Sequence, residues 1–479
     1  MIEEAYPYWL SKQMMKGVRR FNIDSFLVAL EGWRRGLSLT FHNNHAAVTD
    51  LKVIGFEPVG KTFSLSLNDR THFFYRTRGD KVENEAVEVG TNKKETKRIL
   101  ASQQVPVPEG FEFSTATSWE EVARLAEETG YPLTLKPTFG SLGKGVITNI
   151  KTQQELRESM DYVISQHDYT DYLLERHISG DDVRVYVIEG EVAAATKRVP
   201  ANVMGDGVHT IEELVERKNT IRSENPQTST RLIKIDEEMK NFLLKKEKRL
   251  EDVPSDGELV NLKGQSNISA GGDSIDVTDR LRADVAQTAI DAVKAVPGLN
   301  HAGIDLIVND QEAVVIEINP TAGISLHTFP LFGTKQNIAA KIIDYYFPET
   351  KGITVSDKIY FDYKNILDLF RSNSLEQARV TDAPVGQLYA KRYVISGNVQ
   401  KVGYRRWIRR QAIEQGLHGY TRNLNNGNVV VVVAGIDKHT VDDFKDTCYH
   451  GSSKAEVEKI KEFAWDKQIR IGFEIRKSR

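Results

Sequence analysis

The sequence predicts a chain of several α/β and α+β domains, and three observations support this prediction. The chain has 479 residues, which is more than a single domain usually holds. Strand and helix signals alternate through residues 131–200 and again through 280–347. Residues 388–479 follow the order β-α-β-β-α-β, which is typical of a compact two-layer sandwich.

Composition limits the classes of function. Hydrophobic residues make up 40% of the chain and the formal net charge is −3, so no overall basic field points to nucleic acid. The single cysteine, Cys448, excludes an internal disulfide and a cysteine metal site. The acidic N-terminus lacks the pattern of a signal peptide, and no stretch has the apolar length of a membrane span. We therefore expect a cytoplasmic protein without membrane or nucleic-acid partners, and a homo-oligomer stays open.

Shifts in composition suggest four parts. The expected boundaries are an N-terminal domain at 1–90, a second domain at 91–350 with a central subdomain near 100–185 and an insertion near 205–262, a linker at 351–387, and a last domain at 388–479. The linker is predicted from the turn-forming residues Thr381-Asp382-Ala383-Pro384.

Element signals are clearest where caps and periodicity agree. Ser118 is suited to an N-cap, acidic residues follow it, and Gly130 ends the pattern, which predicts a helix over Ser118–Thr129. The other expected helices are Phe26–Arg35, Gln153–Gln166, Tyr404–Gln415, Val441–Cys448 and Ala455–Phe463. The main expected strands are Leu133–Pro137, Ile147–Ile150, Gly303–Val308, Ala313–Ile318, Gly419–Asn423 and Val429–Val433.

Two of these strands carry a pattern of oxygen ligands. Glu317 and Asn319 lie two residues apart on one strand, so both side chains leave the same face. Asp305 lies near the start of the strand expected to pair with it. Such oxygens suit Mg²⁺ or Mn²⁺. On this segment alone, the solvated face of a half-buried sheet explains the alternation equally well.

Two lysines and a glycine-rich turn favour a phosphate ligand. Lys136 lies inside an apolar strand, where a charge needs an anion or a route to water. The turn that follows, residues 139–146, offers Ser141 and backbone N–H groups such as that of Gly143. It is not a Walker A sequence. Lys97 is equally well explained as an exposed helix charge within a charged run.

The order of these motifs resembles the ATP-grasp superfamily over about residues 90–347. Within it, residues 194–207 and 266–279 are most similar to the ligase domains of cyanophycin synthetases and fused glutathione synthetases. The resemblance implies the following roles: phosphate contacts for Lys97 and Lys136, adenine recognition by the hinge that includes Glu175, His177 and Ile178, a ribose contact for Asp182, a γ-phosphate or acyl-phosphate contact for Arg198, and one or two Mg²⁺ held by Asp305, Glu317 and Asn319.

One position departs from the resemblance. Many D-alanine-ligase-type members carry Arg two residues before the first metal Asp, and this chain has Gly303 there. Oxyanion stabilisation is then expected from Arg198 or from the backbone after Pro320. His327 is a further candidate for a substrate contact, and a packing role explains it at least as well.

The implied reaction uses ATP to activate a carboxylate as an acyl phosphate, which an amine then attacks to give an amide, ADP and phosphate. The expected partners are small carboxylates and amines, namely amino acids or peptides. Two alternatives are a carboxylate kinase whose product the last domain hydrolyses, and a non-catalytic ATP-binding sensor. The complete lysine and carboxylate set argues against the sensor.

The last domain resembles acylphosphatase, a ferredoxin-like α/β sandwich, from about residue 388 to 477. A loop rich in backbone donors precedes the helix that carries Arg405. By the resemblance, Arg405 binds the acyl phosphate and Asn423 positions the attacking water. Lys401 stands where the phosphate loop usually has Gly, and Tyr404 where it has Phe. A domain of this kind beside a ligase suggests removal of misactivated acyl phosphate.

Overall fold

The computed structural model describes residues 5–44, 48–53, 59–139, 145–166 and 168–478. The chain divides into two compact units: Met1–Ala5 with Thr77–Tyr345, and Tyr6–Arg76 with Tyr346–Arg479. Within the described ranges, no helix is long and apolar enough to cross a membrane. The first unit begins nearer residue 77 than the boundary at residue 91 that composition suggested.

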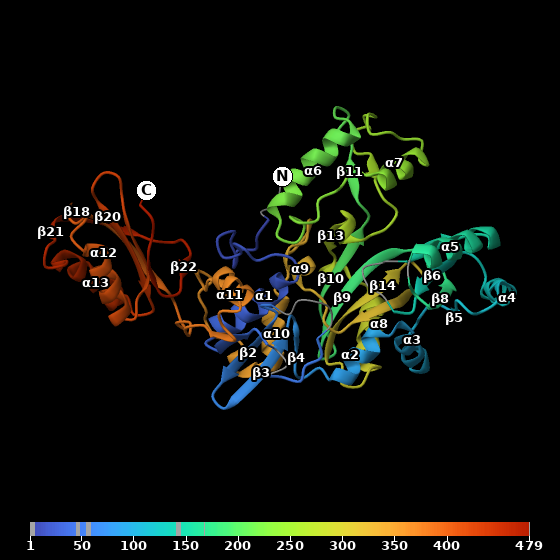
Figure 1. Ribbon diagram of the computed structural model, residues 1–479, viewed down its shortest axis with the longest axis horizontal. Helices are drawn as coiled ribbons and strands as arrows, with labels where there is room; N and C mark the ends of the chain where they lie inside the picture. Colours follow the sequence, from blue (N-terminus) through green and yellow to red (C-terminus); the bar gives the residue numbers. More distant parts are fainter. Residues whose placement is uncertain (1–4, 45–47, 54–58, 140–144, 167, 479) are drawn as a thin grey trace. The chain divides into compact units, whose positions relative to one another are not determined.

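The first unit contains a small antiparallel sheet in the order β5-β8-β6-β7. Its strands are β5 (Gly110–Ser114), β6 (Leu133–Pro137), β7 (Ile147–Ile150) and β8 (Asp171–Arg176). Two helices, α4 (Trp119–Thr129) and α5 (Gln153–Gln166), share a hydrophobic core with it (Figure 1). Ser118 caps α4 by accepting from the Glu121 N–H, as its sequence predicted.

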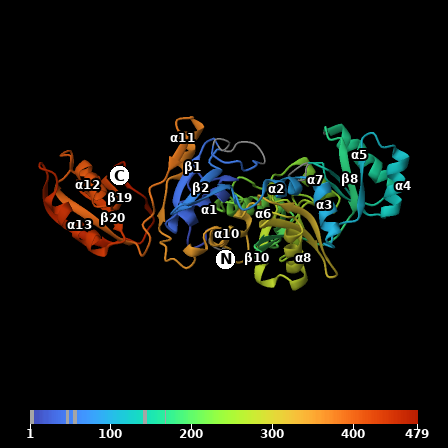
Figure 2. The same cartoon turned by 90° about the horizontal axis from the view of Figure 1, so that it is seen from below.

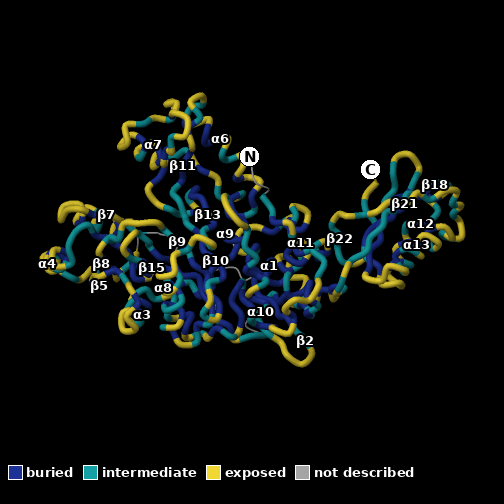
Figure 3. Tube along the Cα trace, turned by 180° about the vertical axis from the view of Figure 1, so that it is seen from behind, coloured by how far each residue is buried: buried dark blue, intermediate teal, exposed yellow. Residues whose placement is uncertain are grey.

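A larger antiparallel sheet, β13-β10-β9-β14-β15, forms the centre of the first unit. Its strands are β9 (Asp181–Ile188), β10 (Glu191–Val199), β13 (Asp273–Asp276), β14 (His301–Val308) and β15 (Ala313–Asn319). Helix α8 (Ala283–Lys294) packs against β9, β10, β14 and β15. Figure 3 shows how much of β9 and β10 is buried. Other elements between residues 77 and 346 are β4 (Arg78–Gly79), α2 (Asn84–Thr91), α3 (Lys93–Ser102), α9 (Ser325–Thr328) and α10 (Ile338–Tyr346).

The expected insertion folds on its own small core. It consists of β11 (Asn202–Met204), α6 (Ile211–Glu224), α7 (Glu237–Leu244) and β12 (Leu259–Asn261), and β11 pairs with β12. Its two helices, α6 and α7, are labelled in Figure 2. Ile211, Leu214, Val215, Met239 and Leu243 bury their side chains in that core. A capping box between Thr210 and Glu213 begins α6.

The second unit begins with α1 (Asn22–Arg34), β1 (Ser38–His42), β2 (Thr62–Leu67) and β3 (Arg70–Tyr75). The expectation of a linker at 351–387 is wrong, because β16 (Ile359–Tyr360), α11 (Tyr363–Arg371) and β17 (Gln377–Arg379) lie there.

These elements complete the fold of the N-terminal residues, because β17 pairs with β1. Helix α11 also buries Tyr363, Ile366, Leu367 and Phe370. That spacing is the helical pattern i, i+3, i+4, i+7. The linker was predicted from the turn residues that follow α11, and this helical pattern was overlooked.

The last part of the chain is a sheet in the order β21-β18-β20-β19-β23. Its strands are β18 (Tyr389–Asn398), β19 (His418–Asn423), β20 (Val429–Gly435), β21 (Glu456–Ala464) and β23 (Phe473–Ile475), with α12 (Tyr404–Glu414) and α13 (Lys438–His450) in the same core and β22 (Ile469–Arg470) before β23. The helix expected over Ala455–Phe463 is wrong, since these residues form β21. Its Glu and Lys residues favour a helix locally, but they also suit a charged edge strand, and pairing with β18 decides the outcome.

Candidate functional site

Strand register aligns a row of polar residues across the larger sheet. Thr196 on β10 lies opposite Arg184 on β9, and Arg184 lies opposite Asp305 on β14. Asp305 in turn lies opposite Glu317 on β15. Because side chains alternate along a strand, Asn319 shares the face of Glu317. The face thus collects the three predicted metal ligands together with Arg184, which sequence analysis did not select.

Asp305 is held by two guanidinium groups. Arg184 donates to it from Nε at 2.6 Å and from Nη2 at 2.7 Å. Arg198 reaches the same carboxylate at 3.2 Å, while its Nε and Nη2 donate to Asp182 at 2.9 and 2.5 Å. Burial alone would raise the pKa of Asp305, but the two arginines outweigh it and lower the pKa to about 2. Asp182, predicted to contact ribose, is thus a partner of Arg198 here.

The pKa of Glu317 shifts in the opposite direction from that of Asp305. Burial, reinforced by the neighbouring charge of Asp305, raises the pKa of Glu317. The amide of Asn319 lies 3.5 Å from Oδ2 of Asp305, so the predicted trio does come together. The buried carboxylate of Asp305, the partly buried carboxylate of Glu317 and an amide oxygen fit a hard divalent cation, which would relieve the repulsion between the carboxylates. In the described part of the chain, no group of three or more His, Cys, Asp or Glu residues is suited to hold a metal, and this trio contains only two residues of those types.

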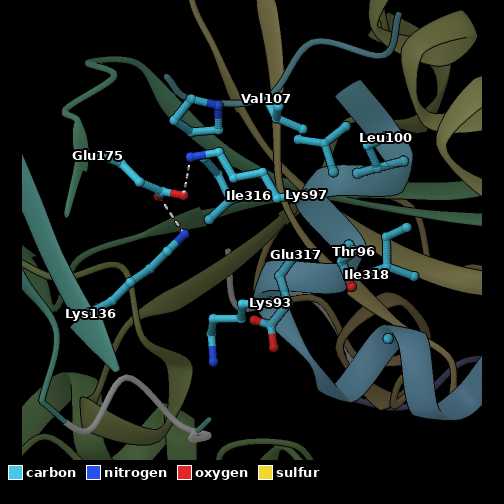
Figure 4. Close-up of a pocket in the computed structure, with 13 residues that line it drawn as sticks. Lys93, Thr96, Lys97, Leu100, Val107, Lys136, Glu175, Ile316, Glu317 and Ile318 are labelled. Atoms are coloured by element: carbon cyan, nitrogen blue, oxygen red, sulfur yellow. Dashed lines mark hydrogen bonds and ion pairs between the residues drawn. The ribbon is translucent and has the colours of Figure 1, made fainter. Parts of the chain in front are cut away.

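A pocket next to this face brings two predicted lysines onto one carboxylate. Glu175, at the end of β8, accepts from Lys97 on α3 at 3.1 Å and from Lys136 on β6 at 2.5 Å (Figure 4). Burial would raise the pKa of Glu175, but Lys136 and Lys97 together lower it. The hinge residue therefore points its carboxylate at the lysines that were expected to hold phosphates.

Lys93 is a lysine of this pocket that the sequence analysis passed over. It lies one helical turn before Lys97, so both occupy the same face of α3. Figure 4 shows Lys93 beside Glu317. Burial lowers the pKa of Lys93, Glu317 opposes this shift, and Lys136 adds to it. Besides the residues already named, the pocket is lined by Gly90, Thr96, Leu100, Val107, Pro108, Val315, Ile316 and Ile318.

The other predicted nucleotide residues have mixed outcomes. Ser141 and Gly143 lie outside the described residues. His177 lies two residues after Glu175, and its Nδ1 lies 3.1 Å from the hydroxyl of Thr134. Ile178 is partly exposed at the end of the same segment. The hinge residues therefore lie at the C-terminal end of β8 and just after it.

His327 is fully buried at the end of the polar row. Its Nδ1 lies 2.7 Å from the hydroxyl of Thr196, and burial lowers its pKa to about 3. Its Nε2 is buried without a hydrogen-bond partner in the described part of the chain. A neutral packing histidine, one of the two readings of the sequence, agrees with this burial.

The candidate site of the last domain lies at the start of α12. Gly403 precedes the helix with φ +78° and Arg405 occupies its first turn. Gln400 donates to the carbonyls of Leu424 and Asn428 at 2.9 Å, which holds the loop beside the residue after Asn423. The Oδ1 atom of Asn423 is buried without a hydrogen-bond partner among the described residues. The loop before the helix of Arg405 is therefore hydrogen-bonded to the turn that follows Asn423.

Comparison with known proteins gives separate matches for two parts of the chain. Residues 90–323 match the ATP-grasp domain family, and residues 391–475 match the acylphosphatase family. A cyanophycin synthetase from Crocosphaera subtropica is 34% identical over 273 residues, which are 55% of this chain and 31% of that protein. A glutathione biosynthesis bifunctional protein from Enterococcus faecalis is 32% identical over 269 residues, 54% of this chain and 35% of that protein. A crystal structure of a bifunctional glutathione synthetase from Pasteurella multocida, 25% identical, covers 62% of this chain and 41% of its own at a TM-score of 0.48.

The chain therefore contains an ATP-grasp domain followed by an acylphosphatase domain, and the two resemblances seen in the sequence are confirmed. The predicted fold class, an ATP-grasp fold followed by a ferredoxin-like sandwich, is confirmed as well. The chain spans about a third of the length of the curated relatives named above.

Proposed function

We propose that this protein is an ATP-dependent carboxylate–amine ligase that forms an amide through an acyl phosphate and releases ADP. The observation that carries the proposal is the meeting of opposite charges in one buried region. Lys93, Lys97 and Lys136 line the same pocket as Glu317, and Glu317 lies opposite Asp305. Cations for phosphates beside a carboxylate pair for a divalent ion suit phosphoryl transfer. The names of the relatives favour amino acids or peptides as substrates.

The roles follow from these positions. Lys97 and Lys136 orient the α- and β-phosphates, and the segment from Glu175 to Ile178 recognises the adenine edge. Mg²⁺ or Mn²⁺ held by Asp305, Glu317 and Asn319 would screen the charge of the phosphoryl oxygens. The substrate carboxylate attacks the γ-phosphorus, and the bond to the β,γ-bridging oxygen breaks with its electron pair going to ADP.

The second half-reaction needs no protein nucleophile. The amine attacks the acyl carbon, phosphate leaves, and the amine nitrogen loses a proton. We assign Asp182 to the ribose and Arg198 to the acyl phosphate. The guanidinium of Arg198 contacts both Asp182 and Asp305, so it lies between the proposed ribose residue and the proposed metal ligands.

The test is ADP release with Mg-ATP across single amino acids and pairs of amino acids. We expect release that requires one pair and disappears in Glu317→Ala. Glu128→Ala is the matched control, because that glutamate is 60% exposed on α4. Absence of ADP release from the wild-type chain with every carboxylate and amine would refute the proposal.

A second candidate function is a carboxylate kinase whose acyl phosphate the C-terminal domain hydrolyses, and the acylphosphatase match favours it. The same assay separates the two. ADP release with a single carboxylate and no amine, accompanied by free phosphate, would establish the kinase.

We also propose that the C-terminal domain hydrolyses acyl phosphates, with Arg405 binding the phosphate and Asn423 orienting the water. In this role it would remove misactivated intermediate of the ligase. Benzoyl phosphate is a suitable probe, and Arg405→Ala should abolish its hydrolysis. Arg410→Ala, an exposed arginine on the same helix, should not. If Arg405→Ala left both benzoyl phosphate hydrolysis and unproductive ATP turnover unchanged, the role would be wrong.

A further inference from the structure

The C-terminal domain is basic, although the whole chain is slightly acidic. Residues 388–479 contain 18 Lys and Arg residues against 10 Asp and Glu residues, whereas the formal net charge of the chain is −3. Part of this excess lies around the phosphate loop, because residues 397–413 contain five Lys and Arg residues and no Asp or Glu residue. Such a field attracts anionic ligands, and most strongly those with more than one negative charge.

Lys401 lies within this loop in an unusual backbone conformation. Its φ is +62°, in the left-handed region that glycine enters without strain and other residues enter at a cost. The acylphosphatase pattern usually has glycine at this position. The chain therefore keeps a long, charged side chain where its backbone conformation is unfavourable, and such outliers are typical of functional loops.

Hydrogen bonds on both sides of Lys401 fix its place beside the proposed phosphate site. Gln400, just before it, donates to two carbonyls in the turn that follows Asn423, both at 2.9 Å. The carbonyl of Val402, just after it, accepts from the hydroxyl of Ser452 at 3.0 Å. The backbone at Lys401 is thus tied to the turn of the proposed water-orienting residue.

The ammonium group of Lys401 is available to a ligand. Lys401 is exposed, and within the described part of the chain neither it nor Arg405, Arg406 or Arg409 forms an ion pair. Arg410, further along the same helix, does pair with a carboxylate of the chain. The cations nearest to the start of α12 are therefore not neutralised by the protein itself.

We propose that Lys401 binds a free carboxylate on the acyl part of the substrate, so that the C-terminal domain prefers acyl phosphates with a second anionic group. This rests on the proposed acylphosphatase activity and not on the ligase. A dicarboxylic amino acid or an acidic peptide keeps a free carboxylate when another one is activated, so its acyl phosphate belongs to this class. A lysine suits this task, because its compact ammonium sits on a flexible stem. Lys401 takes no part in bond making or breaking and gives up no proton.

The competing explanation is a solvated surface lysine without influence on substrate choice. Hydrolysis of two substrates by the full chain separates the explanations: benzoyl phosphate has a neutral acyl group, and 4-carboxybenzoyl phosphate adds one carboxylate. The readout is the ratio of their kcat/KM values, compared between variants so that intrinsic reactivity cancels. We expect Lys401→Gln to lower the preference for the carboxylated substrate about 2- to 5-fold, the range of an exposed ion pair, through KM and with kcat unchanged. High ionic strength should reduce the preference of the wild type in the same way.

Two further variants guard against a distorted loop. Lys401→Arg keeps the charge and should keep the preference. Lys401→Gly removes the charge and supplies the residue that this conformation favours, so it should hydrolyse benzoyl phosphate and lose the preference. Lys438→Gln removes a lysine that is 62% exposed on α13 and is the matched control, with the ratio of the wild type. An unchanged ratio in Lys401→Gln and Lys401→Gly, or an equal loss of rate with both substrates, would overturn the proposal.

A binding experiment tests the proposal without turnover. Calorimetry compares benzylphosphonate with 4-carboxybenzylphosphonate, two analogues that cannot be hydrolysed. We expect Lys401→Gln to weaken binding of the carboxylated analogue about 2- to 5-fold and to leave binding of benzylphosphonate unchanged. Equal binding of each analogue by the wild type and Lys401→Gln would overturn the inference. A wild type that hydrolyses neither acyl phosphate would refute the acylphosphatase function, and the two phosphonates would then still decide whether Lys401 binds the carboxylate.

Discussion

Glu175→Gln should destabilise the ATP-grasp domain strongly. Glu175 is 4% exposed and is the shared partner of Lys136, which is 8% exposed, and Lys97, which is 20% exposed. Removing one member of a buried ion pair costs about 3–5 kcal/mol, because the remaining charge is left buried without a partner. Lys97 reaches some solvent, which screens part of its charge, so we expect a loss of about 3 kcal/mol.

Thermal unfolding of the ligand-free protein measures this loss. For a domain of this size, about 3 kcal/mol corresponds to a melting temperature lower by about 6–12 °C. Glu128→Gln removes an exposed carboxylate and should change the transition by less than about 2 °C. If Glu175→Gln melts together with that control, the two lysines do not depend on Glu175 and the electrostatic reasoning is refuted.

Three further changes test other parts of the structure. Asp273→Asn should destabilise the insertion by about 3–5 kcal/mol, seen as faster limited proteolysis, because Asp273 is 2% exposed and binds Lys218 and Arg222. Lys401→Gly should raise unfolding free energy by less than about 1 kcal/mol, since Lys401 has φ +62° and glycine adopts that conformation without strain but has a freer unfolded state. Burial lowers the pKa of His327 from 6.5 to about 3, so its contribution to stability is lost as pH falls from about 6.5 towards 3, by about 1.4 kcal/mol per pH unit. His327→Asn should therefore make urea-derived stability depend less steeply on pH in that range, and an unchanged slope would contradict the burial argument.

The sequence predicted those features that a single strand or helix carries by itself. Glu317 and Asn319 were recognised because two residues on one strand share a face whatever the rest of the chain does. Lys136 was recognised because a charge within an apolar strand needs an explanation. The helix at Ser118–Thr129 was recognised from its caps, and the structure places α4 there.

The features that were missed depend on pairing between distant strands. Arg184 alternates with apolar residues along β9, so the sequence alone gives it the pattern of a solvated strand face. Only the register of β9 against β14 places it on Asp305. The strand β21 was taken for a helix for the same reason, since its pairing with β18 is not visible locally. Lys93 was passed over because it belongs to a charged run, and the sequence does not show which lysines of that run are buried.

The site shows why cations and carboxylates must be considered together. Lys97 and Lys136 meet Glu175, and the two arginines of the larger sheet meet Asp305. A buried cation without a partner would destabilise the fold, so a protein that collects several of them for phosphate binding needs carboxylates of its own. The pKa of Glu317 is raised by burial, and the neighbouring charge of Asp305 adds to this shift. The carboxylates of Asp305 and Glu317 therefore repel each other in spite of the nearby cations, and a divalent cation bound between them would relieve that repulsion.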